Sequence, residues 1–328
     1  MTMNRIFVLG AAGFVGREVV KDAVARGDQV LALCRHEAQA EALRTLGATP
    51  VVGDVRESER WATQLSGATH VFDLIQPPLP ARLGDAAISR ASAERVAAMR
   101  SLVGAIASLP AGQRPVLISV SGLADLARDS RGLLSAASQP QSDPRGFARI
   151  GLPVRAVVER SGLARAFVHL GTVYGPGKAF AARLLPNLAR GKAPIIGDGG
   201  NRMALIHVTD AARALVHLTT LEPAELIAKT WIVADGAGST QRDLFEHGAR
   251  LMGGPPPRRV PRWLASLVAG SATASTLAAD SPVDNSALLA TGFRFRYPSH
   301  QTGLPATVQT FLEQRREANT PASEAVRR

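Results

Sequence analysis

Short apolar runs alternate with longer amphipathic segments along most of the chain. Short runs bounded by turn residues are typical of strands buried in a parallel sheet, and segments with apolar residues at helical spacing are typical of the covering helices. The alternation predicts an α/β fold with a doubly wound parallel sheet. The predicted strands are 5–9, 29–33, 49–53, 70–75, 115–120, 166–170, 204–208 and 230–234. The predicted helices are 17–26, 37–46, 57–65, 86–109, 149–161, 179–190 and 210–221, the last with Asp210 as its N-cap.

The remaining segments predict a second, smaller domain. Residues 255–300 are rich in Pro, Ser and Arg, with one apolar helix predicted at 263–268. Residues 124–146 are polar and contain prolines, which predicts a mobile loop. The predicted organisation is a nucleotide-binding domain, a smaller C-terminal substrate-binding domain and a flexible tail. The nucleotide-binding domain is predicted to comprise 1–175, with 204–235 returning to it. The substrate-binding domain comprises 176–203 and 236–316, and the tail is 317–328.

A glycine-rich turn joins the first predicted strand to the first predicted helix. The spacing of Gly10, Gly13 and Gly16 suits a sharp turn, close approach of a pyrophosphate, and close packing of the helix on the sheet. The helix N-terminus also offers N–H groups and a partial positive charge to phosphates. The alternative is an ordinary turn with chance glycines. The strand–turn–helix context favours a dinucleotide site in a Rossmann-type domain.

The end of the second predicted strand indicates which dinucleotide is bound. A pocket that prefers NAD usually has Asp or Glu about 20 residues after the glycines, where it binds the ribose hydroxyls. Cys34 and Arg35 stand there instead. Because the planar guanidinium pairs well with phosphate oxygens, Arg35 favours NADP(H) over NAD(H). The alternative is a solvated arginine in an arginine-rich chain.

Composition and charge exclude several classes of protein. The chain has 328 residues, 46% of them apolar, so it can bury a large core. Its single cysteine excludes an intrachain disulfide and fits a reducing, cytoplasmic location. No signal peptide and no membrane span are expected. The net charge of +11 comes mostly from scattered arginines, which argues against nucleic-acid binding because that function favours a clustered basic face.

Several short motifs follow one another along the chain. They are the Gly10–Gly16 turn, Gly53-Asp54, Ser119-Val-Ser121, Thr172–Gly177, Ile196–Gly200, Leu205–Asp210 and Asp284-Asn285-Ser286. In this order the motifs resemble the extended short-chain dehydrogenase/reductase family, also called the NAD-dependent epimerase/dehydratase family. The resemblance covers nearly the whole chain. It implies an N-terminal sheet that holds the cofactor and a smaller C-terminal part that forms the substrate site.

The glycine turn and the resemblance together imply a set of site residues. The resemblance implies that Asp54 contacts the adenine and that Ser121 is the catalytic serine, which hydrogen-bonds the reacting oxygen. The alternative for Ser121 is a serine that merely ends a strand. The residues expected to bind the cofactor are Gly10, Gly13, Phe14, Val15, Gly16, Arg35, Asp54, Val55, Leu74, Ile75, Gln76, Ser119, Leu170 and Val173.

The sequence departs from the family at the usual acid–base pair. Members that transfer hydride usually carry Tyr-x-x-x-Lys after the fifth strand, and these positions fall on Phe147 and Gly151. No tyrosine occurs before Tyr174 and no lysine between Lys21 and Lys178, so that helix lacks the pair. Tyr174 and Lys178 have the literal spacing, but the Gly-Pro-Gly between them disfavours a helix. Tyr174 alone, water, or a proton already on the substrate stay open as replacements.

The remaining polar residues of the motifs favour structural roles. His169 stands where the family has an arginine and is expected to be buried and satisfied, and His207 matches a histidine that is usually structural. No His, Cys and Asp spacing indicates a metal. Ser121 lacks the Gly-x-Ser-x-Gly context of a hydrolase nucleophile, which argues against hydrolysis.

The sequence therefore predicts an NADPH-dependent oxidoreductase that reduces a small organic substrate without the usual pair. Such a site suits an activated carbonyl, imine or quinone-like acceptor, because these need less acid assistance than a plain ketone. Two alternatives stay open: a non-catalytic NADP(H)-binding sensor or assembly protein, and a redox-neutral epimerase or dehydratase acting on a nucleotide sugar. The expected partners are a small-molecule substrate and, as one option, a second copy of the chain in a homodimer.

Overall fold

A parallel seven-stranded sheet forms the centre of the molecule. The computed structural model describes residues 3–78, 84–177, 180–269 and 278–319. The strand order is β3–β2–β1–β4–β5–β6–β10, and every neighbouring pair is parallel. The order reverses between β1 and β4, and ligands of such sheets bind there, at the carboxyl ends of the strands. The strands are β1 (Arg5–Leu9), β2 (Gln29–Cys34), β3 (Thr49–Val52), β4 (His70–Asp73), β5 (Val116–Gly122), β6 (Arg165–Leu170) and β10 (Thr230–Val233).

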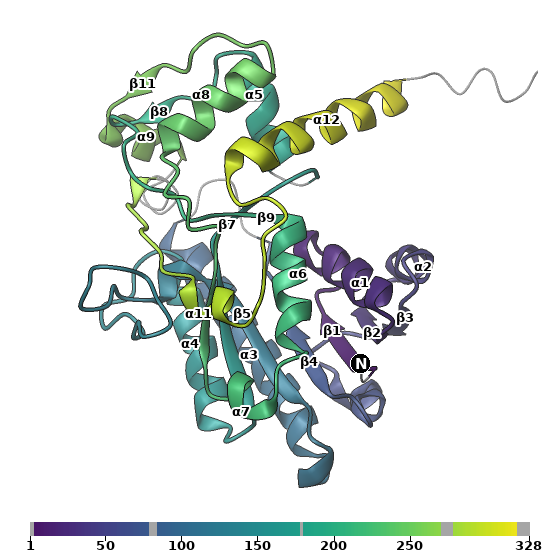
Figure 1. Cartoon of the computed structure of the whole chain (residues 1–328). Coiled ribbons are helices and arrows are strands. Elements are labelled where there is room, and N and C mark those ends of the chain that lie inside the picture. Colours follow the sequence, from purple (N-terminus) through teal and green to yellow (C-terminus); the bar gives the residue numbers. More distant parts are fainter. Residues whose placement is uncertain (1–2, 79–83, 178–179, 270–277, 320–328) are drawn as a thin grey trace, which may run out of the picture.

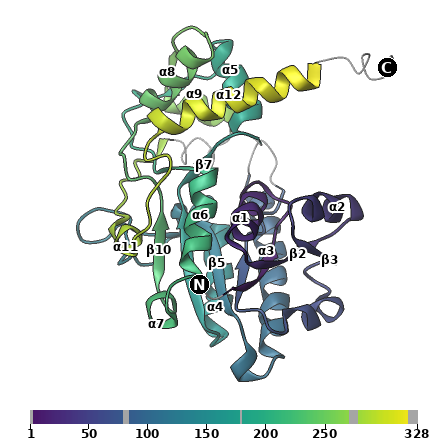
Figure 2. The same ribbon diagram turned by 45° about the vertical axis from the view of Figure 1, so that its right-hand side comes forward.

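Helices cover both faces of this sheet (Figures 1 and 2). Alternate residues of a strand point to opposite faces, so Ile6 and Val8 of β1 join one apolar cluster while Phe7 and Leu9 join the other. The doubly wound architecture predicted from the sequence is confirmed. The first cluster includes α1 (Phe14–Arg26), α2 (Glu37–Thr45) and α6 (Val208–Leu218). The second cluster includes α3 (Asp85–Ala107) and α4 (Ala148–Arg160).

A smaller lobe lies beyond the carboxyl ends of the strands, at the top of Figure 1. It has its own apolar core, in which Leu188, Phe245 and Val308 pack together. The pair β7 (Thr172–Tyr174) and β9 (Leu205–His207) leads from the sheet into this lobe. Its elements are α5 (Leu185–Ala189), β8 (Ile195–Ile196), α8 (Gln241–Leu251), β11 (Arg259–Val260), α9 (Arg262–Ala269) and α12 (His300–Asn319). Short helices α7 (Pro223–Leu226) and α11 (Ser286–Ala290) flank β10.

Two local predictions are wrong. The predicted helix at 57–65 consists of two 3₁₀ turns, Ser58–Arg60 and Ala62–Leu65, because the fully buried Trp61 interrupts it and donates from Nε1 to the Asp54 carbonyl at 2.9 Å. Asp210 is not the N-cap of α6. The cap is His207, whose Nδ1 accepts from the Thr209 N–H at 3.2 Å.

Asp210 instead ties the chain's C-terminal part to the sheet domain. Its buried carboxylate accepts from the backbone N–H groups of Arg296 at 2.8 Å and Tyr297 at 2.7 Å, and it pairs with Arg213. A carboxylate in the first turn of a helix also complements the helix dipole.

After the 3₁₀ turn Leu123–Asp125, the rest of the segment 124–146 is mostly coil, and hydrogen bonds anchor it at several points. Leu134 exchanges backbone hydrogen bonds with the chain at Pro282 and Asp284, at 2.9 Å each. Asp129 accepts from the Ser135 hydroxyl at 2.7 Å, and Arg131 bridges Asp129 and Asp284. The polar composition predicted a mobile loop. The structure shows a loop that hydrogen bonds and an ion pair join to residues 282–284, just before α11.

Within the described ranges, no helix combines the length and the apolar character that crossing a membrane requires.

Candidate functional site

Two of the three glycines in the turn between β1 and α1 leave no room for a side chain. Gly10 has a φ of +78°, and a Cβ there would lie 2.6 Å from the Leu74 carbonyl oxygen. A Cβ on Gly16 would collide with the Gly10 carbonyl oxygen, so this glycine allows α1 to pack against the turn. Gly13 is exposed, and its Cβ would meet only the Gly10 oxygen, at 3.0 Å. The space beyond Gly13 is therefore open to a ligand.

The N-terminus of α1 is suited to an anion. Gly13 is the N-cap and provides no side-chain cap, and the first turn, which begins at Phe14 and Val15, carries no acidic residue. The first N–H groups of a helix have no partner within the helix, and the helix dipole makes this end positive. The residues present therefore fit the pyrophosphate of a dinucleotide.

The carboxyl ends of β2 and β3 present two arginines and one carboxylate. Cys34 is buried, and this burial raises the pKa of its thiol. The next residue, Arg35, is exposed. Asp54 follows β3 and accepts from the Nη2 of Arg56 at 2.9 Å. This hydrogen bond, with a smaller effect of the Arg35 charge, lowers the pKa of Asp54 to about 2. The sequence pattern did not indicate Arg56, whose guanidinium pairs with Asp54.

The end of β4 lies directly against the glycine turn. The backbone of Leu74 and Ile75 faces Gly10, and the Leu74 N–H donates to the Leu9 carbonyl at 3.0 Å. Just before them, the buried Asp73 pairs with the buried Arg95 of α3 at 2.6 Å. The predicted site residue Gln76 follows and is exposed.

The end of β5 holds a hydroxyl–carboxylate pair. Ser119 is buried, in register between Asp73 of β4 and Phe167 of β6. Ser121 donates from its Oγ to the Oδ2 of Asp125 at 2.5 Å. Asp125 is 2% exposed, and this burial raises the pKa of its carboxyl to about 6, against the opposing effects of the Ser121 hydrogen bond and the Arg155 charge.

Tyr174 lies away from this pair. It is fully buried in the core of the smaller lobe, where its ring contacts His207 edge-on at 5.2 Å between centroids. Among the residues that the structure describes, its hydroxyl donates only to the Ser299 carbonyl, at 3.4 Å, and a Cβ at Gly303 of α12 would collide with it. Lys178, the other half of the literal Tyr-x-x-x-Lys, lies outside the described residues. The structure therefore places the phenol of Tyr174 among packing side chains.

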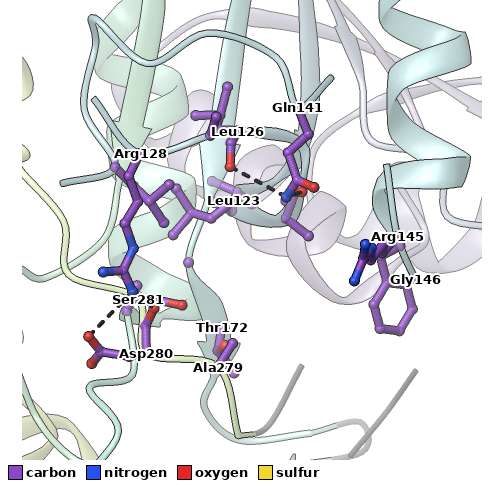
Figure 3. A pocket seen from close by; sticks show the side chains of 18 of the residues that line it. Leu123, Leu126, Arg128, Gln141, Arg145, Gly146, Thr172, Ala279, Asp280 and Ser281 are labelled. Carbon is purple, nitrogen blue, oxygen red and sulfur yellow. Dashed lines mark hydrogen bonds and ion pairs between the residues drawn. The ribbon is translucent and has the colours of Figure 1, made fainter. Parts of the chain in front are cut away.

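A cavity of about 750 Å³ opens beside the ends of β5 and β6 (Figure 3). Its apolar lining includes Leu123, Leu126, Leu134 and Leu170. Arg128, Gln141 and Arg145 add polar side chains to the lining (Figure 3). Arg128 donates to the backbone oxygen of Asp280 at 2.6 Å and pairs with its carboxylate, which closes one side. Phe147, at the start of α4, also lines the cavity.

The structure brings most of the predicted site residues to one edge of the sheet. The residues there lie at the carboxyl ends of successive strands or just after them: the glycine turn, Arg35, Asp54–Val55, Leu74–Gln76, Ser119, Ser121 and Leu170–Val173. Gly177 lies near Phe14 of α1, since a Cβ on Gly177 would be 3.9 Å from the Phe14 ring. Sequence reasoning missed Asp125 and the cavity. Asp125 stands four residues after Ser121, but its inward orientation depends on α4, which is distant in sequence.

The two histidines of the sequence motifs, His169 and His207, are buried among packing side chains. His169 is buried, with Nδ1 3.0 Å from the Gly122 carbonyl, and burial lowers its pKa to about 4. His207 is enclosed between Tyr174 and Tyr297, and burial likewise lowers its pKa to about 4. In the part of the chain that the structure describes, no group of three His, Cys, Asp or Glu residues could hold a metal ion.

Comparisons with known proteins agree with this geometry. The sequence pattern of NAD(P)H-binding proteins matches residues 10–143, and that of the NAD dependent epimerase/dehydratase family matches residues 152–230. The uncharacterized protein C2A9.02 of Schizosaccharomyces pombe is 30% identical over 65% of this chain and 69% of its own length. A 3-diazoavenalumate denitrifying reductase of a Streptomyces species is 29% identical over 92% of this chain and 99% of its own.

Solved structures show the same fold. Human epimerase family protein SDR39U1, crystallised with NADPH, superposes with a TM-score of 0.76 at 19% identity, over 93% of this chain and 99% of that chain. The UDP-glucose 4-epimerase of Thermotoga maritima, with UDP-glucose, superposes with a TM-score of 0.73 at 18% identity, over 94% and 99%. The fold and the residues at the carboxyl edge of the sheet together define an NAD(P)-binding protein of the Rossmann type. The chain belongs to the NAD-dependent epimerase/dehydratase family, within the extended, atypical short-chain dehydrogenases/reductases.

Proposed function

We propose that this protein is an NADPH-dependent oxidoreductase that reduces a small, activated organic acceptor. The observation that carries the proposal is that the nucleotide-binding edge of the sheet adjoins the cavity. The nucleotide-binding edge ends at Gly122 and Leu170, and these residues also form the inner wall of the cavity. In the Rossmann arrangement the second half of the sheet holds the second nucleotide. An acceptor in the cavity would therefore lie next to the nicotinamide.

The chain's own residues supply the cofactor contacts. The N-terminus of α1, with Gly10, Gly13 and Gly16, would hold the pyrophosphate, and Arg35 would hold a 2′-phosphate. Among the described residues, the structure gives the Arg35 guanidinium no ion pair, so it is available to a phosphate. This supports a preference for NADP(H) over NAD(H). The cofactor, when bound, supplies a hydride.

Ser121 is the residue that we propose to touch the acceptor. It lies at the carboxyl end of β5 and is only partly buried, whereas the Tyr174 hydroxyl is enclosed in the smaller lobe. The helix that follows, α4, has the sequence ARIGLPVRAVVER and contains neither tyrosine nor lysine. A hydroxyl at this position can hydrogen-bond the reacting atom of the acceptor and transfer a proton to it.

The relatives' names support a reductase that acts on activated groups. The Streptomyces relative is named a reductase of 3-diazoavenalumate. A Stigmatella aurantiaca relative, 37% identical over 68 residues, is named a ketoreductase of a dihydroquinoline-oxide. We propose an activated carbonyl, imine, quinone-like or diazo group as the acceptor. The apolar lining of the cavity favours an acceptor carried on a flat apolar body.

The smaller lobe has a supporting role in this proposal. Met203 and residues 279–281 form the outer wall of the cavity, so we propose that 176–203 and 236–316 act as a substrate-binding unit on the sheet domain. A homodimer and a cytoplasmic location stay predictions.

Binding and turnover measurements test the proposed function. The purified protein is titrated with NADPH and with NADH, and NADPH oxidation is then followed with phenanthrenequinone, an aryl diazonium salt, an N-methyl iminium ion and a plain ketone. Tighter binding of NADPH and oxidation by activated acceptors, with little by the ketone, are expected. Equal affinities would remove the cofactor preference. No oxidation with any acceptor would favour the non-catalytic NADP(H)-binding alternative.

A further inference from the structure

The proposed reduction needs a proton source, and α4 lacks the usual one. The structure places a carboxylate at the vacated position. Gly151, where the family's lysine would stand, has no side chain, and a Cβ built there would collide with both oxygens of Asp125. The Asp125 carboxyl thus occupies the space in which a side chain from α4 would begin. Glycine at 151 is a steric requirement of this arrangement.

The carboxyl is held firmly on the side of Ser121. Asp125 ends the 3₁₀ turn Leu123–Asp125 that follows β5 directly, and its backbone carbonyl accepts from the Gln141 N–H at 2.9 Å. The Gln141 side chain donates to the Ala124 carbonyl at 2.6 Å. These bonds fix the turn, so the Oδ2 of Asp125 meets the Ser121 hydroxyl at 2.5 Å. A hydrogen bond of this length is typical of a hydroxyl that donates to a carboxylate.

Arg155 is the charged group that faces this pair from α4. Its guanidinium lies 4.1 Å from the centroid of the Phe167 ring and pairs with Glu159 at 2.8 Å. Its Nη1 is 3.5 Å from the Nε2 of His169, whose lowered pKa keeps it neutral at ordinary pH. Arg155 acts on Asp125 through its charge, and the structure gives no direct hydrogen bond between them. Burial therefore raises the pKa of Asp125 and the Arg155 charge lowers it, with a result of about 6. The carboxyl can exchange its proton near neutral pH.

We infer that Asp125 and Ser121 form a proton relay that replaces the family's tyrosine–lysine pair. The inference rests on the proposed function. In the reduction, the acceptor gains a hydride with its electron pair from the cofactor and a proton from the Ser121 hydroxyl. In its acid form Asp125 is the donor of the 2.5 Å hydrogen bond to Ser121. It gives its proton to the Ser121 oxygen as Ser121 gives its own to the acceptor, and the carboxylate that is left takes up one proton from solvent. The acceptor thus gains the hydride, which brings two electrons and one proton, and one further proton from Ser121. Asp125 acts through Ser121, so it is a positioning residue and proton reservoir.

Two acceptors separate the relay from the rest of catalysis. Phenanthrenequinone needs a proton to become a hydroquinone, whereas N-methylacridinium is a cation that hydride neutralises without any proton. In the parent protein, kcat for the quinone should fall as the pH rises through about 6, because the acid form of Asp125 is consumed. Asp125→Asn keeps an oxygen that accepts from Ser121 but has no proton to give. It should lower the quinone rate at least about a hundredfold at acidic pH, abolish this pH dependence, and leave the acridinium rate within about twofold.

Further variants guard against misfolding. Ser121→Ala should also lose the acidic limb of the quinone profile, and Gly151→Ala should lower the quinone rate because its Cβ displaces the carboxyl. The matched control is Glu313→Gln on the exposed face of α12, which should change neither rate. If Asp125→Asn does not fold, Ser121→Ala decides. An unchanged pH profile in Ser121→Ala, or equal losses with both acceptors, would overturn the relay.

One readout does not depend on turnover. In protein labelled with ¹³C on the aspartate carboxyls, the resonance that disappears in Asp125→Asn should titrate near pH 6 in the parent and shift in Ser121→Ala. A titration near the ordinary value of 3.8 would overturn the relay. If the parent reduces acridinium but Asp125→Asn keeps the parent quinone rate, only the relay fails. If the parent reduces neither acceptor, the proposed function fails and the relay fails with it.

Discussion

The two halves of the nucleotide-binding edge are built in different ways. Around β1, β2 and β3 the edge depends on backbone: Gly10 and Gly16 admit no Cβ, and the N-terminus of α1 is left open. Around β4, β5 and β6 the edge depends on side chains that come from distant parts of the chain. Asp125 fits only because Gly151 of α4 is bare, and Asp280 closes the cavity through Arg128.

This difference separates what is general in the family from what is particular to this chain. A backbone cradle suits the phosphates that all dinucleotides share, and it leaves no room for a side chain at Gly10 or Gly16. A site made of side chains can exchange one proton donor for another while the sheet stays the same. Variants in the first half should therefore change cofactor affinity, and variants in the second half should change turnover or its pH dependence.

The largest effect is expected for Gly13→Val in the first half. Its φ of −76° suits valine, so the fold should persist, but the branched side chain would fill the space open to the pyrophosphate. Isothermal titration should show at least about a hundredfold weaker NADPH binding, roughly 2.7 kcal/mol. The control is Gly104→Val at an exposed position of α3, where a Cβ meets nothing within 4 Å. Parent affinity in a folded Gly13→Val would show that the turn is not the phosphate site.

In the second half, Ser121→Ala should separate turnover from binding. Removing the hydroxyl that we propose to touch the acceptor should lower kcat with a neutral acceptor by about a hundredfold, or roughly 2.7 kcal/mol in the barrier. The NADPH dissociation constant should stay within about twofold, because the phosphate contacts that we propose lie in the glycine turn and not at Ser121. Steady-state kinetics and fluorescence titration measure the two quantities. Equal losses in both would mean that the halves are not independent.

The same difference explains what the sequence could predict. The glycine turn is local, so the three glycines and their strand–turn–helix context identify it without a structure. The apolar runs likewise predicted the strands of the central sheet. Asp125 could not be identified, because its role depends on the absence of a side chain at Gly151, 26 residues further along the chain. Tyr174 was a candidate acid because of its motif, but the packing of α12 against its ring is a long-range contact that no local pattern records.

Arg35→Ala should have a smaller effect than Gly13→Val, and only on one cofactor. One charge-assisted hydrogen bond is worth about 1.5–3 kcal/mol, so NADPH should bind roughly ten- to a hundredfold more weakly, while NADH should change little. The control is Arg44→Ala on α2, which removes the same charge from a guanidinium already paired with Glu37 and Glu41. Equal loss of NADPH and NADH affinity would place Arg35 elsewhere than at the 2′-phosphate.

Asp235→Asn should change the pH dependence of stability by a few °C. Asp235 follows β10, and burial raises the pKa of its carboxyl to about 7 from 3.8. The unfolded chain loses this proton first, so the parent should lose stability as the pH rises from about 4 to about 7. The variant should lack this loss and melt on the order of a few °C higher than the parent at pH 8, but not at pH 4. The exposed Asp143→Asn should change little at either pH.

The smallest effect is expected for Tyr174→Phe, although its motif makes it a candidate acid. Its hydroxyl makes one long hydrogen bond, of 3.4 Å to the Ser299 carbonyl, and burial raises its pKa above the ordinary value. A phenol that is enclosed and harder to ionise is a poor proton donor, so kcat should stay within about twofold and the free energy of unfolding within about 1 kcal/mol. The chain's other tyrosine offers the matched control, Tyr297→Phe. A hundredfold loss in Tyr174→Phe alone, with an unchanged melting temperature, would mean that the smaller lobe opens to bring this phenol to the acceptor. The second half would then depend on motion as well as on side chains.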